Sequence, residues 1–234
     1  MPGPTDLLAT WESGLASGPA HRAVLLHALT GGGRLDVPVG RRDRDLFALR
    51  RELFGERLNG RVMCRHCETE QEFDFEVANV LGVESPGAEE FGVEVGEWRV
   101  RLRLPNSGDL LAAAAAGPRE ARQVLLTRCT LAARRQDEPD GDLPDEVQSA
   151  MASAIAEADP GADVRLSMPC VECGQSTSAT IDIVSYLWSE VDAWARGIML
   201  DVHLLASAYG WTEAAVLELS PTRRRYYLEL VGHA

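Results

Sequence analysis

The sequence contains two Cys-x-x-Cys pairs in matching surroundings, and no other feature restricts the possible folds as strongly. The first pair is Cys64 and Cys67 in "RVMCRHCETEQEFDF", and the second is Cys170 and Cys173 in "RLSMPCVECGQSTSATIDI". Apolar residues alternate with polar ones on both sides of each pair, which is the period-2 pattern of a half-buried strand. Each pair is therefore predicted to lie at the tip of a β-hairpin.

A single shared zinc site explains both pairs. Structural zinc sites often use four cysteine thiolates in a tetrahedron, and a two-residue spacing lets one tight turn direct both sulfur atoms at the ion. The hairpins, within residues 58–77 and 163–183, would then face each other as a zinc ribbon. The ribbon would be split, because 102 residues lie between Cys67 and Cys170, whereas compact ribbons have about 15–20.

Two other interpretations of the cysteines remain open. One is a redox-active Cys-x-x-Cys, although such a motif normally opens a helix in a βαβ unit. The other is two separate pairs without metal. His66 could replace a cysteine as ligand, but four thiolates already complete the shell and place it outside. Cys129, at helical spacing from Leu125 and Leu126, is interpreted as a small core residue.

Composition limits the partners and the compartment. The 234-residue chain has a net charge of −13, which argues against sequence-independent nucleic-acid binding. All 23 basic residues are arginine, so lysine-dependent chemistry is excluded. We expect no membrane span, since no apolar run reaches about 18 residues. The first residues lack the pattern of a signal peptide, so we expect a cytoplasmic protein with reduced cysteines.

Helical periodicity dominates the rest of the chain. The predicted organisation is N-terminal helices in residues 1–34, then a single domain in residues 35–234 with a helical insert at 97–160 and a helical tail at 184–234. Within the insert, residues 98–105 are predicted as a strand and residues 118–135 as a helix. The tail begins with the longest helix, which ends near Gly210. The predicted fold class is α+β, mostly helical, with a split zinc ribbon and a long C-terminal helix.

The tail is the candidate partner-binding region. Aromatic and arginine side chains are enriched at interfaces, and several lie close together here. Adjacent helical residues cannot both face one core, so at least one of two neighbouring tyrosines is expected to meet solvent or a partner. The alternative is that the aromatic residues pack the helices together. The candidate residues are Trp211, Arg223, Arg224, Arg225, Tyr226 and Tyr227.

The same tail raises an alternative function, a zinc-ribbon or helix-turn-helix regulator that binds nucleic acid. The spacing of Ala206, Gly210 and Val216 resembles a helix-turn-helix. The second helix, however, offers Glu213 and Glu218 where phosphates would lie, and acidic residues are repelled there. We therefore interpret the motif as a packing solution and expect no nucleic-acid partner. An enzyme is not expected, because no catalytic motif is present and a four-thiolate metal has no open position.

Two stretches resemble the baseplate hub assembly chaperone family of contractile-tailed phages and phage-tail-like contractile injection systems. They are "LDVPVGRRDRDLFALRRELFGERLNGRVMCRHCETEQEFDF" and "SYLWSEVDAWARGIMLDVHLLASAYGWTEAAVLELSPTRRRYYLELV". The resemblance implies a chaperone or structural component that acts during baseplate assembly. The implied partners are hub and spike proteins, and the family provides no catalytic residues to assign.

Overall fold

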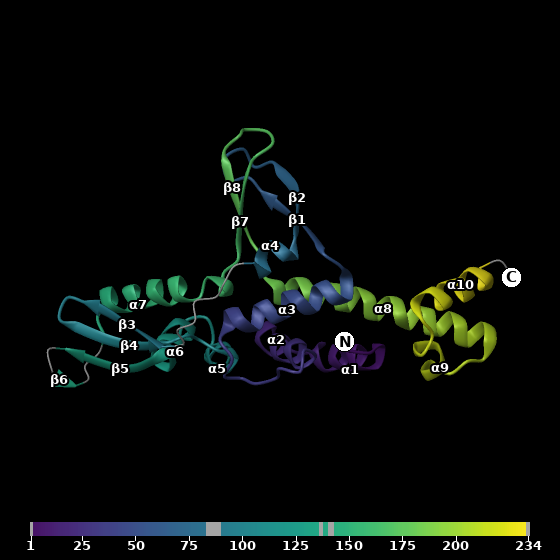
Figure 1. The fold of residues 1–234 in the computed structure, drawn as a ribbon, viewed down its shortest axis with the longest axis horizontal. Coiled ribbons are helices and arrows are strands. Elements are labelled where there is room, and N and C mark those ends of the chain that lie inside the picture. The colour runs from purple at the N-terminus through teal and green to yellow at the C-terminus, as the bar shows by residue number, and fades with distance from the viewer. Residues whose placement is uncertain (1, 83–89, 136–137, 140–142, 233–234) are drawn as a thin grey trace.

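The computed structural model describes residues 2–82, 90–135, 138–139 and 143–232. Helices hold 56% of the chain and strands 20%, and the strands form small antiparallel sheets beside a long C-terminal helix. The predicted mixture, rich in helix, is therefore confirmed. Figure 1 shows a central helical body from which three parts extend: a pair of hairpins, a sheet-containing insert and a C-terminal tail.

Four helices enclose the main hydrophobic core of the body. They are α1 (Pro4–Gly14), α2 (Pro19–Ala28), α3 (Val39–Phe54) and the first half of α8 (Ile183–Tyr209). Removing their apolar faces from water supplies the main favourable free energy of this part. The most deeply buried side chains of the core include Leu26, Leu46, Phe47, Leu187 and Val191. Residues from both ends of the sequence thus build one core.

The ends of the two longest helices are set by a capping side chain and by glycines with positive φ. Helix α3 stops at Gly55, whose φ of 96° is readily available only to glycine. Helix α8 begins after Asp182, whose carboxylate accepts the Ser185 N–H at 3.1 Å. It ends at Gly210, which has a left-handed φ of 67°. The predicted long C-terminal helix is confirmed.

Two antiparallel hairpins rise together from the body (Figure 1). The first consists of β1 (Arg57–Met63) and β2 (Glu70–Glu76), and the second of β7 (Arg165–Pro169) and β8 (Ser176–Thr180). The short helix α4 (Val77–Leu81) follows the first hairpin, and a 3₁₀ turn at Pro160–Ala162 precedes the second. Both hairpins lie where the alternating pattern predicts them.

The insert between the hairpins contains its own sheet. The strand order is β3 (Glu90–Val95), β4 (Trp98–Arg103), β5 (Thr130–Arg135) and β6 (Glu138–Pro139), all antiparallel. Helix α7 (Asp145–Ala158) packs on this sheet, with α6 (Ala121–Cys129) at its edge. A second hydrophobic core lies between them, formed by Val100, Leu102, Leu126, Val147 and Met151. The insert is therefore a folded unit with a core of its own.

The strand predicted at residues 98–105 is present as β4, but the helix predicted over residues 118–135 is wrong in its second part. The helix predicted over residues 118–135 ends at Cys129, and the chain continues as β5. Strand β5 pairs with β4, placing Arg134 opposite Arg99 and Arg135 opposite Trp98. Alanine and arginine favour a helix in isolation, but strand pairing depends on packing and neighbours, and here those interactions override the local preference.

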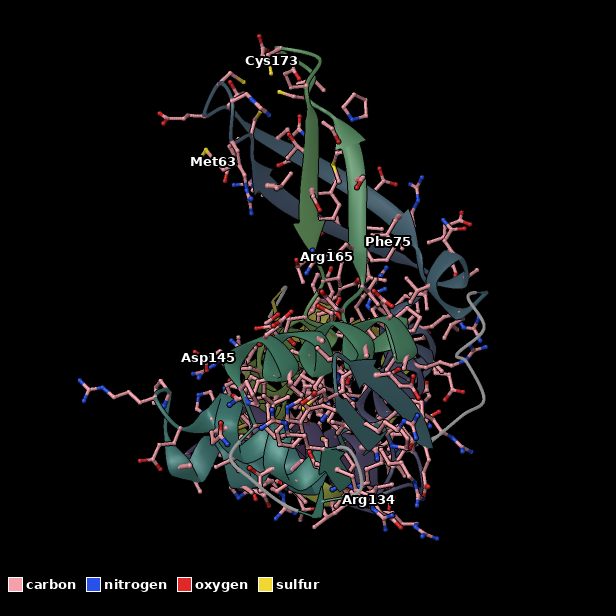
Figure 2. The ribbon with its side chains drawn as sticks, turned by 90° about the vertical axis from the view of Figure 1, so that its left-hand side faces the viewer. Met63, Phe75, Arg134, Asp145, Arg165 and Cys173 are labelled. Atoms are coloured by element: carbon pink, nitrogen blue, oxygen red, sulfur yellow. The ribbon has the colours of Figure 1, made fainter. Side chains whose placement is uncertain are left out.

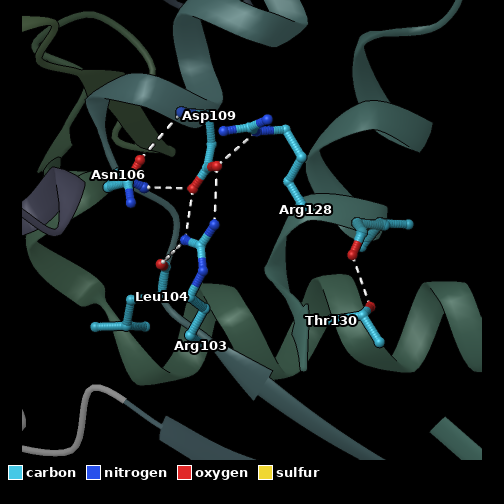
Figure 3. Close-up of polar contacts among 7 residues, drawn as sticks. Arg103, Leu104, Asn106, Asp109, Arg128 and Thr130 are labelled. Carbon is cyan, nitrogen blue, oxygen red and sulfur yellow. Dashed lines mark hydrogen bonds and ion pairs between the residues drawn. The ribbon is translucent and has the colours of Figure 1, made fainter. Parts of the chain in front are cut away.

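A buried carboxylate joins three elements of the insert (Figure 3). Asp109, at the start of α5 (Ser107–Ala116), is 0% exposed. Both its oxygen atoms accept from Arg103 on β4, at 2.6 and 2.9 Å, and one also accepts from Arg128 on α6 at 2.7 Å. Its backbone and side chain complete a capping box with Asn106. Burial raises the pKa of Asp109, but the hydrogen bonds from Arg103, the Asn106 N–H and Arg128 outweigh it and hold the pKa below its usual value.

The C-terminal tail folds back on the end of α8. Helix α9 (Glu213–Leu217) is capped by Thr212, and α10 (Pro221–Val231) is capped by Ser220. The Ser220 hydroxyl oxygen accepts the Arg223 N–H at 3.3 Å, as a helix N-cap does. Figure 1 places the tail at the opposite end of the molecule from the insert.

Candidate metal centre

The two cysteine turns share one backbone geometry. In the first, the Cys64 N–H donates to the Thr69 carbonyl at 2.9 Å, and the Glu68 N–H donates to the Cys64 carbonyl at 2.9 Å. In the second, the corresponding bonds join Cys170 and Gln175 at 2.8 Å, and Gly174 and Cys170 at 2.9 Å. These bonds fold each Cys-x-x-Cys into a tight knuckle with both sulfur atoms on one side.

Each knuckle turns back into its strand through a residue with positive φ. Gly174 fills this position in the second knuckle, with φ 72°, and Glu68 fills it in the first, with φ 56°. Among the described non-glycine residues, Glu68 alone has a positive φ. A glutamate adopts this conformation at a cost that glycine avoids. The knuckle geometry is thus maintained even where the residue type opposes it.

The hairpins bring all four cysteine sulfur atoms together at their tips, where Figure 2 shows Cys173. The Sγ atoms of Cys64 and Cys173 are 3.7 Å apart, and those of Cys67 and Cys170 are 3.6 Å apart. All four lie within 4.8 Å of one another. Metal–sulfur bonds of about 2.3 Å in a tetrahedron give sulfur separations of about 3.8 Å. The cluster is therefore compatible with one tetrahedral metal ion.

Hydrogen bonds and neighbouring groups shift the pKa values of the cysteine thiols. The Thr177 hydroxyl and neighbouring backbone N–H groups lower the pKa of Cys64 to about 5. For Cys173, the Gln175 N–H favours the thiolate, but burial and the three other cysteines outweigh it and raise the pKa to about 12. Four thiolates this close repel one another, so the protein alone cannot ionise the whole set. A bound cation removes that repulsion and deprotonates its ligands.

Two buried polar side chains beside the cluster test whether a metal fits. Gln71 and Thr177 are 5% and 3% exposed and occupy equivalent positions, each the second residue of its outgoing strand. The Gln71 carbonyl accepts the Val171 N–H of the opposite knuckle at 3.1 Å. Its Nε2 and the Thr177 Oγ1 lack regular hydrogen-bond partners in the described chain. Thr177 nevertheless lies close enough to Cys64 to lower its pKa, so we assign the sulfur as its acceptor.

These two residues support the metal hypothesis and were missed in the sequence. A buried donor without a partner is unfavourable beside a neutral thiol, but it is satisfied by a thiolate that carries metal-bound charge. The detectable signal was the polar residue at the buried phase of each strand, Gln71 and Thr177, where alternation predicts an apolar one. The Thr177 hydroxyl thus fits a charged four-sulfur centre, and the Gln71 side chain links the two knuckles through the Val171 N–H.

The remaining cysteine and the histidine lie outside the cluster. Cys129 is 1% exposed in the insert, and burial raises the pKa of its thiol to about 11, as expected for a core residue. The His66 side chain is exposed, and its backbone N–H lies 3.5 Å from the Cys64 sulfur. No cysteine of the chain forms a disulfide. The four predicted ligands are thus the ones that converge.

The predicted partner-binding residues divide into internal and exposed groups. Arg224 is 9% exposed and pairs with Asp201 of α8 at 3.0 Å. Trp211 and Tyr227 pack edge to face with ring centroids 4.8 Å apart. Tyr226 is 65% exposed, and Arg223 and Arg225 are also exposed, with Arg225 paired to Glu229. Six large exposed apolar side chains belong to the same tail, on α8 and α10: Met199, Leu200, Leu204, Tyr209, Tyr226 and Leu230.

The helix-turn-helix spacing corresponds to a packing arrangement. Leu205 and Val216 are fully buried where α8 and α9 meet, and Gly210 makes the turn. The second helix, α9, has 5 residues, which is a little over one turn and too short to lie along a major groove. Within the described residues, no helix is both long and apolar enough to cross a membrane.

The fold and the cluster define a mixed helical and antiparallel-sheet protein with a four-cysteine candidate metal centre. Comparison with protein-family models, with curated proteins and with solved structures found no match. The functional interpretation therefore rests on the chemistry of the cysteine cluster and on the exposed surfaces.

Proposed function

We propose that Cys64, Cys67, Cys170 and Cys173 hold one structural Zn²⁺ and that the two hairpins form a split zinc ribbon. Support comes from the donor set, since four thiolates in a tetrahedron are the commonest choice of structural zinc. The shared knuckle geometry and the buried donors Gln71 and Thr177 support the same assignment. Four protein ligands complete the shell, so the ion's contribution is to link the hairpins.

The proposed role of the whole protein is non-enzymatic. A metal with four protein ligands has no position for water or substrate, so it does not activate either. We assign the protein as an assembly chaperone or structural component of the baseplate hub in a contractile, phage-tail-like injection system. It would act in the cytoplasm, where such particles are built and where cysteines remain available to metal.

The observation that carries this role is the exposed apolar surface of the tail, within the second stretch of the family resemblance. Tyr226 and Leu230 are 65% and 60% exposed and lie one turn apart on α10. Leu200, on α8, is 57% exposed. Exposed apolar side chains gathered in one region mark a protein-interaction surface. Hub and spike proteins are the partners that the resemblance implies.

Co-purification tests the role. Tagged protein is expressed with hub, spike, sheath and tube proteins of a contractile system, and captured proteins are identified by mass spectrometry. We expect the hub or spike protein to be retained by the wild type and lost from a Tyr226→Ser, Leu230→Ser double variant. The matched control is Met63→Ser with Leu131→Ser, which removes exposed apolar side chains elsewhere. Equal capture by both double variants, or no capture by the wild type, contradicts the proposal.

A further inference from the structure

A cleft of about 420 Å³ runs along β8, between the two hairpins. Three basic side chains and a row of hydroxyl groups line it: Arg65, His66, Arg165, Ser176, Thr177, Ser178 and Thr180. None of these described lining residues is acidic, although acidic residues outnumber arginines 36 to 23 in the chain. The cleft is therefore a cationic site in an acidic protein.

The charges in the cleft are available to a ligand. The Arg65 guanidinium and the His66 ring have no hydrogen-bond or ion-pair partner among the described residues. Arg165 pairs with Asp163, but both side chains are substantially exposed, at 65% and 43%. An exposed pair of this kind contributes little and exchanges partners readily. Both arginines can thus accept a new carboxylate, and the His66 ring offers a further hydrogen-bonding group beside Arg65.

Comparison of the two hairpins shows that the metal cluster does not require this composition. The knuckles superimpose in pattern, so each lining position has an equivalent on the other hairpin. In the first knuckle the residues between the cysteines are Arg65 and His66, and in the second they are Val171 and Glu172. The exposed positions of β8 carry hydroxyl groups, whereas their equivalents on β2 are acidic: Glu70, Glu72 and Asp74. The acidic residues of β2 are paired with Arg57 and Arg61 of β1, whereas β8 presents hydroxyl groups beside Arg65 and Arg165.

The length of the cleft indicates the kind of ligand. Strands rise about 3.3 Å per residue, so the line from Ser176 to Thr180 is about 13 Å long. The two arginines lie at its two ends, because Arg65 belongs to the tip and Arg165 pairs in register with Thr180 at the base. Figure 2 shows Arg165 at the base of the hairpins and Cys173 at their tip. A single small oxyanion cannot contact both ends.

We propose that this cleft binds an extended acidic peptide segment of a partner protein, with acidic side chains at alternate positions. In an extended chain, residues i, i+2 and i+4 share one face and repeat about every 6.6 Å, which matches the hydroxyl row of β8. The outer carboxylates accept hydrogen bonds from Arg65 and Arg165, and the central one accepts from Ser178. The site goes beyond the proposed assembly role and does not depend on it.

Fluorescence anisotropy with a labelled peptide tests the proposal. The probe is Gly-Glu-Ser-Glu-Ser-Glu-Gly. One comparison peptide has the same composition but places the three glutamates next to one another, and a second has glutamine in place of each glutamate. Arg65→Gln and Ser178→Glu are each expected to weaken binding of the alternating peptide about tenfold, because a charge-assisted hydrogen bond is lost or a like charge is added. Ser178→Glu copies Glu72 at the equivalent position, which the hairpin already accepts. Glu172→Gln, in the second knuckle and outside the lining of the cleft, is the control and leaves binding unchanged.

Each result decides the matter. Tightest binding of the alternating peptide, weakened by both cleft variants and not by Glu172→Gln, supports the site. Equal binding of the glutamine peptide, no binding of any peptide, or equal behaviour of all variants overturns it. Displacement by inorganic phosphate at the same concentration as unlabelled peptide also overturns it, in favour of a small-oxyanion site. If Ser178→Glu loses its metal, Arg65→Gln decides alone. Loss of hub capture by the tail variant leaves these outcomes untouched.

Discussion

Replacing Cys170 with serine is the sharpest test of the proposed zinc site. Its side chain is 3% exposed and its sulfur lies 3.6 Å from that of Cys67. Structural zinc contributes an apparent binding free energy of about 10–16 kcal/mol, which is about 3 kcal/mol for each of four thiolates. Loss of one thiolate should therefore weaken zinc binding roughly 150-fold.

Cys129→Ser is the matched control, since Cys129 is also buried, at 1% exposed, but lies in the insert at the end of α6. A hydroxyl there loses part of its hydration and should lower the free energy of unfolding by about 1–2 kcal/mol. This variant should leave zinc affinity unchanged, because the Cys129 sulfur is not one of the four that converge. The two variants thus separate metal binding from general stability.

Metal analysis and chelator competition measure the effect. Protein purified under reducing conditions without chelator should contain about one zinc per chain, and a chromophoric chelator should extract it far more readily from Cys170→Ser than from Cys129→Ser. The melting temperature, followed by circular dichroism, should fall further for Cys170→Ser than for Cys129→Ser. Absence of metal from the wild type, or equal extraction from both variants, would refute the ligand assignment.

Three further predictions concern the fold. Glu68→Gly should stabilise the zinc-bound hairpin by about 0.5–1 kcal/mol, because glycine adopts the positive φ without strain. Gly174→Ala should destabilise it by about 1–2 kcal/mol for the opposite reason. Chelator competition shows whether zinc affinity rises or falls in each variant. Asp109→Asn should lower the free energy of unfolding by about 3–5 kcal/mol, because it leaves two arginines without their buried partner. Asp36→Asn, which breaks an exposed pair, should change it by less than about 1 kcal/mol. Urea titrations of both variants measure the difference. Asp43 has its pKa raised to about 6, chiefly by burial, so its contribution to stability is full below the unfolded value of 3.8 and is lost as pH rises through about 6. Unfolding titrations at pH 4 to 8 should show that decline in the wild type and not in Asp43→Asn; parallel curves would contradict it.

Local patterns in the sequence were sufficient for the hairpins and the long helices. Alternation around each Cys-x-x-Cys has a single physical reading, because successive side chains of a strand point to opposite faces. Helix ends were equally predictable where glycine takes a positive φ, as at Gly55 and Gly210. The shared cysteine cluster followed from the chemistry of its ligands, since two matched pairs in one chain suit a single tetrahedral ion.

Features that depend on distant partners were not predictable in this way. Residues 130–135 have a helical composition and become a strand only because β4 offers them an edge. Arg103 continues the alternation of exposed arginines on β4, yet its side chain reaches inward to Asp109. The sequence around Asp109 predicts only a capping role at the start of a helix, so this ion pair could not be predicted from it. The cleft along β8 needs both hairpins in place before its charges converge.

The position of the cysteine cluster indicates what metal binding does for the molecule. An isolated two-stranded hairpin is marginally stable in water, and β1 and β7 here bury few side chains, so packing alone holds the tips weakly. A cross-link between Cys67 and Cys170 closes a loop of about 100 residues, which in the chain-entropy description is worth about 4–5 kcal/mol. The helical body and the insert have separate cores that do not include the tips. Zinc removal should therefore increase amide hydrogen exchange in β1, β2, β7 and β8 while the amides of α3 and α8 stay protected, and uniform loss of protection would show that the metal supports the whole fold instead.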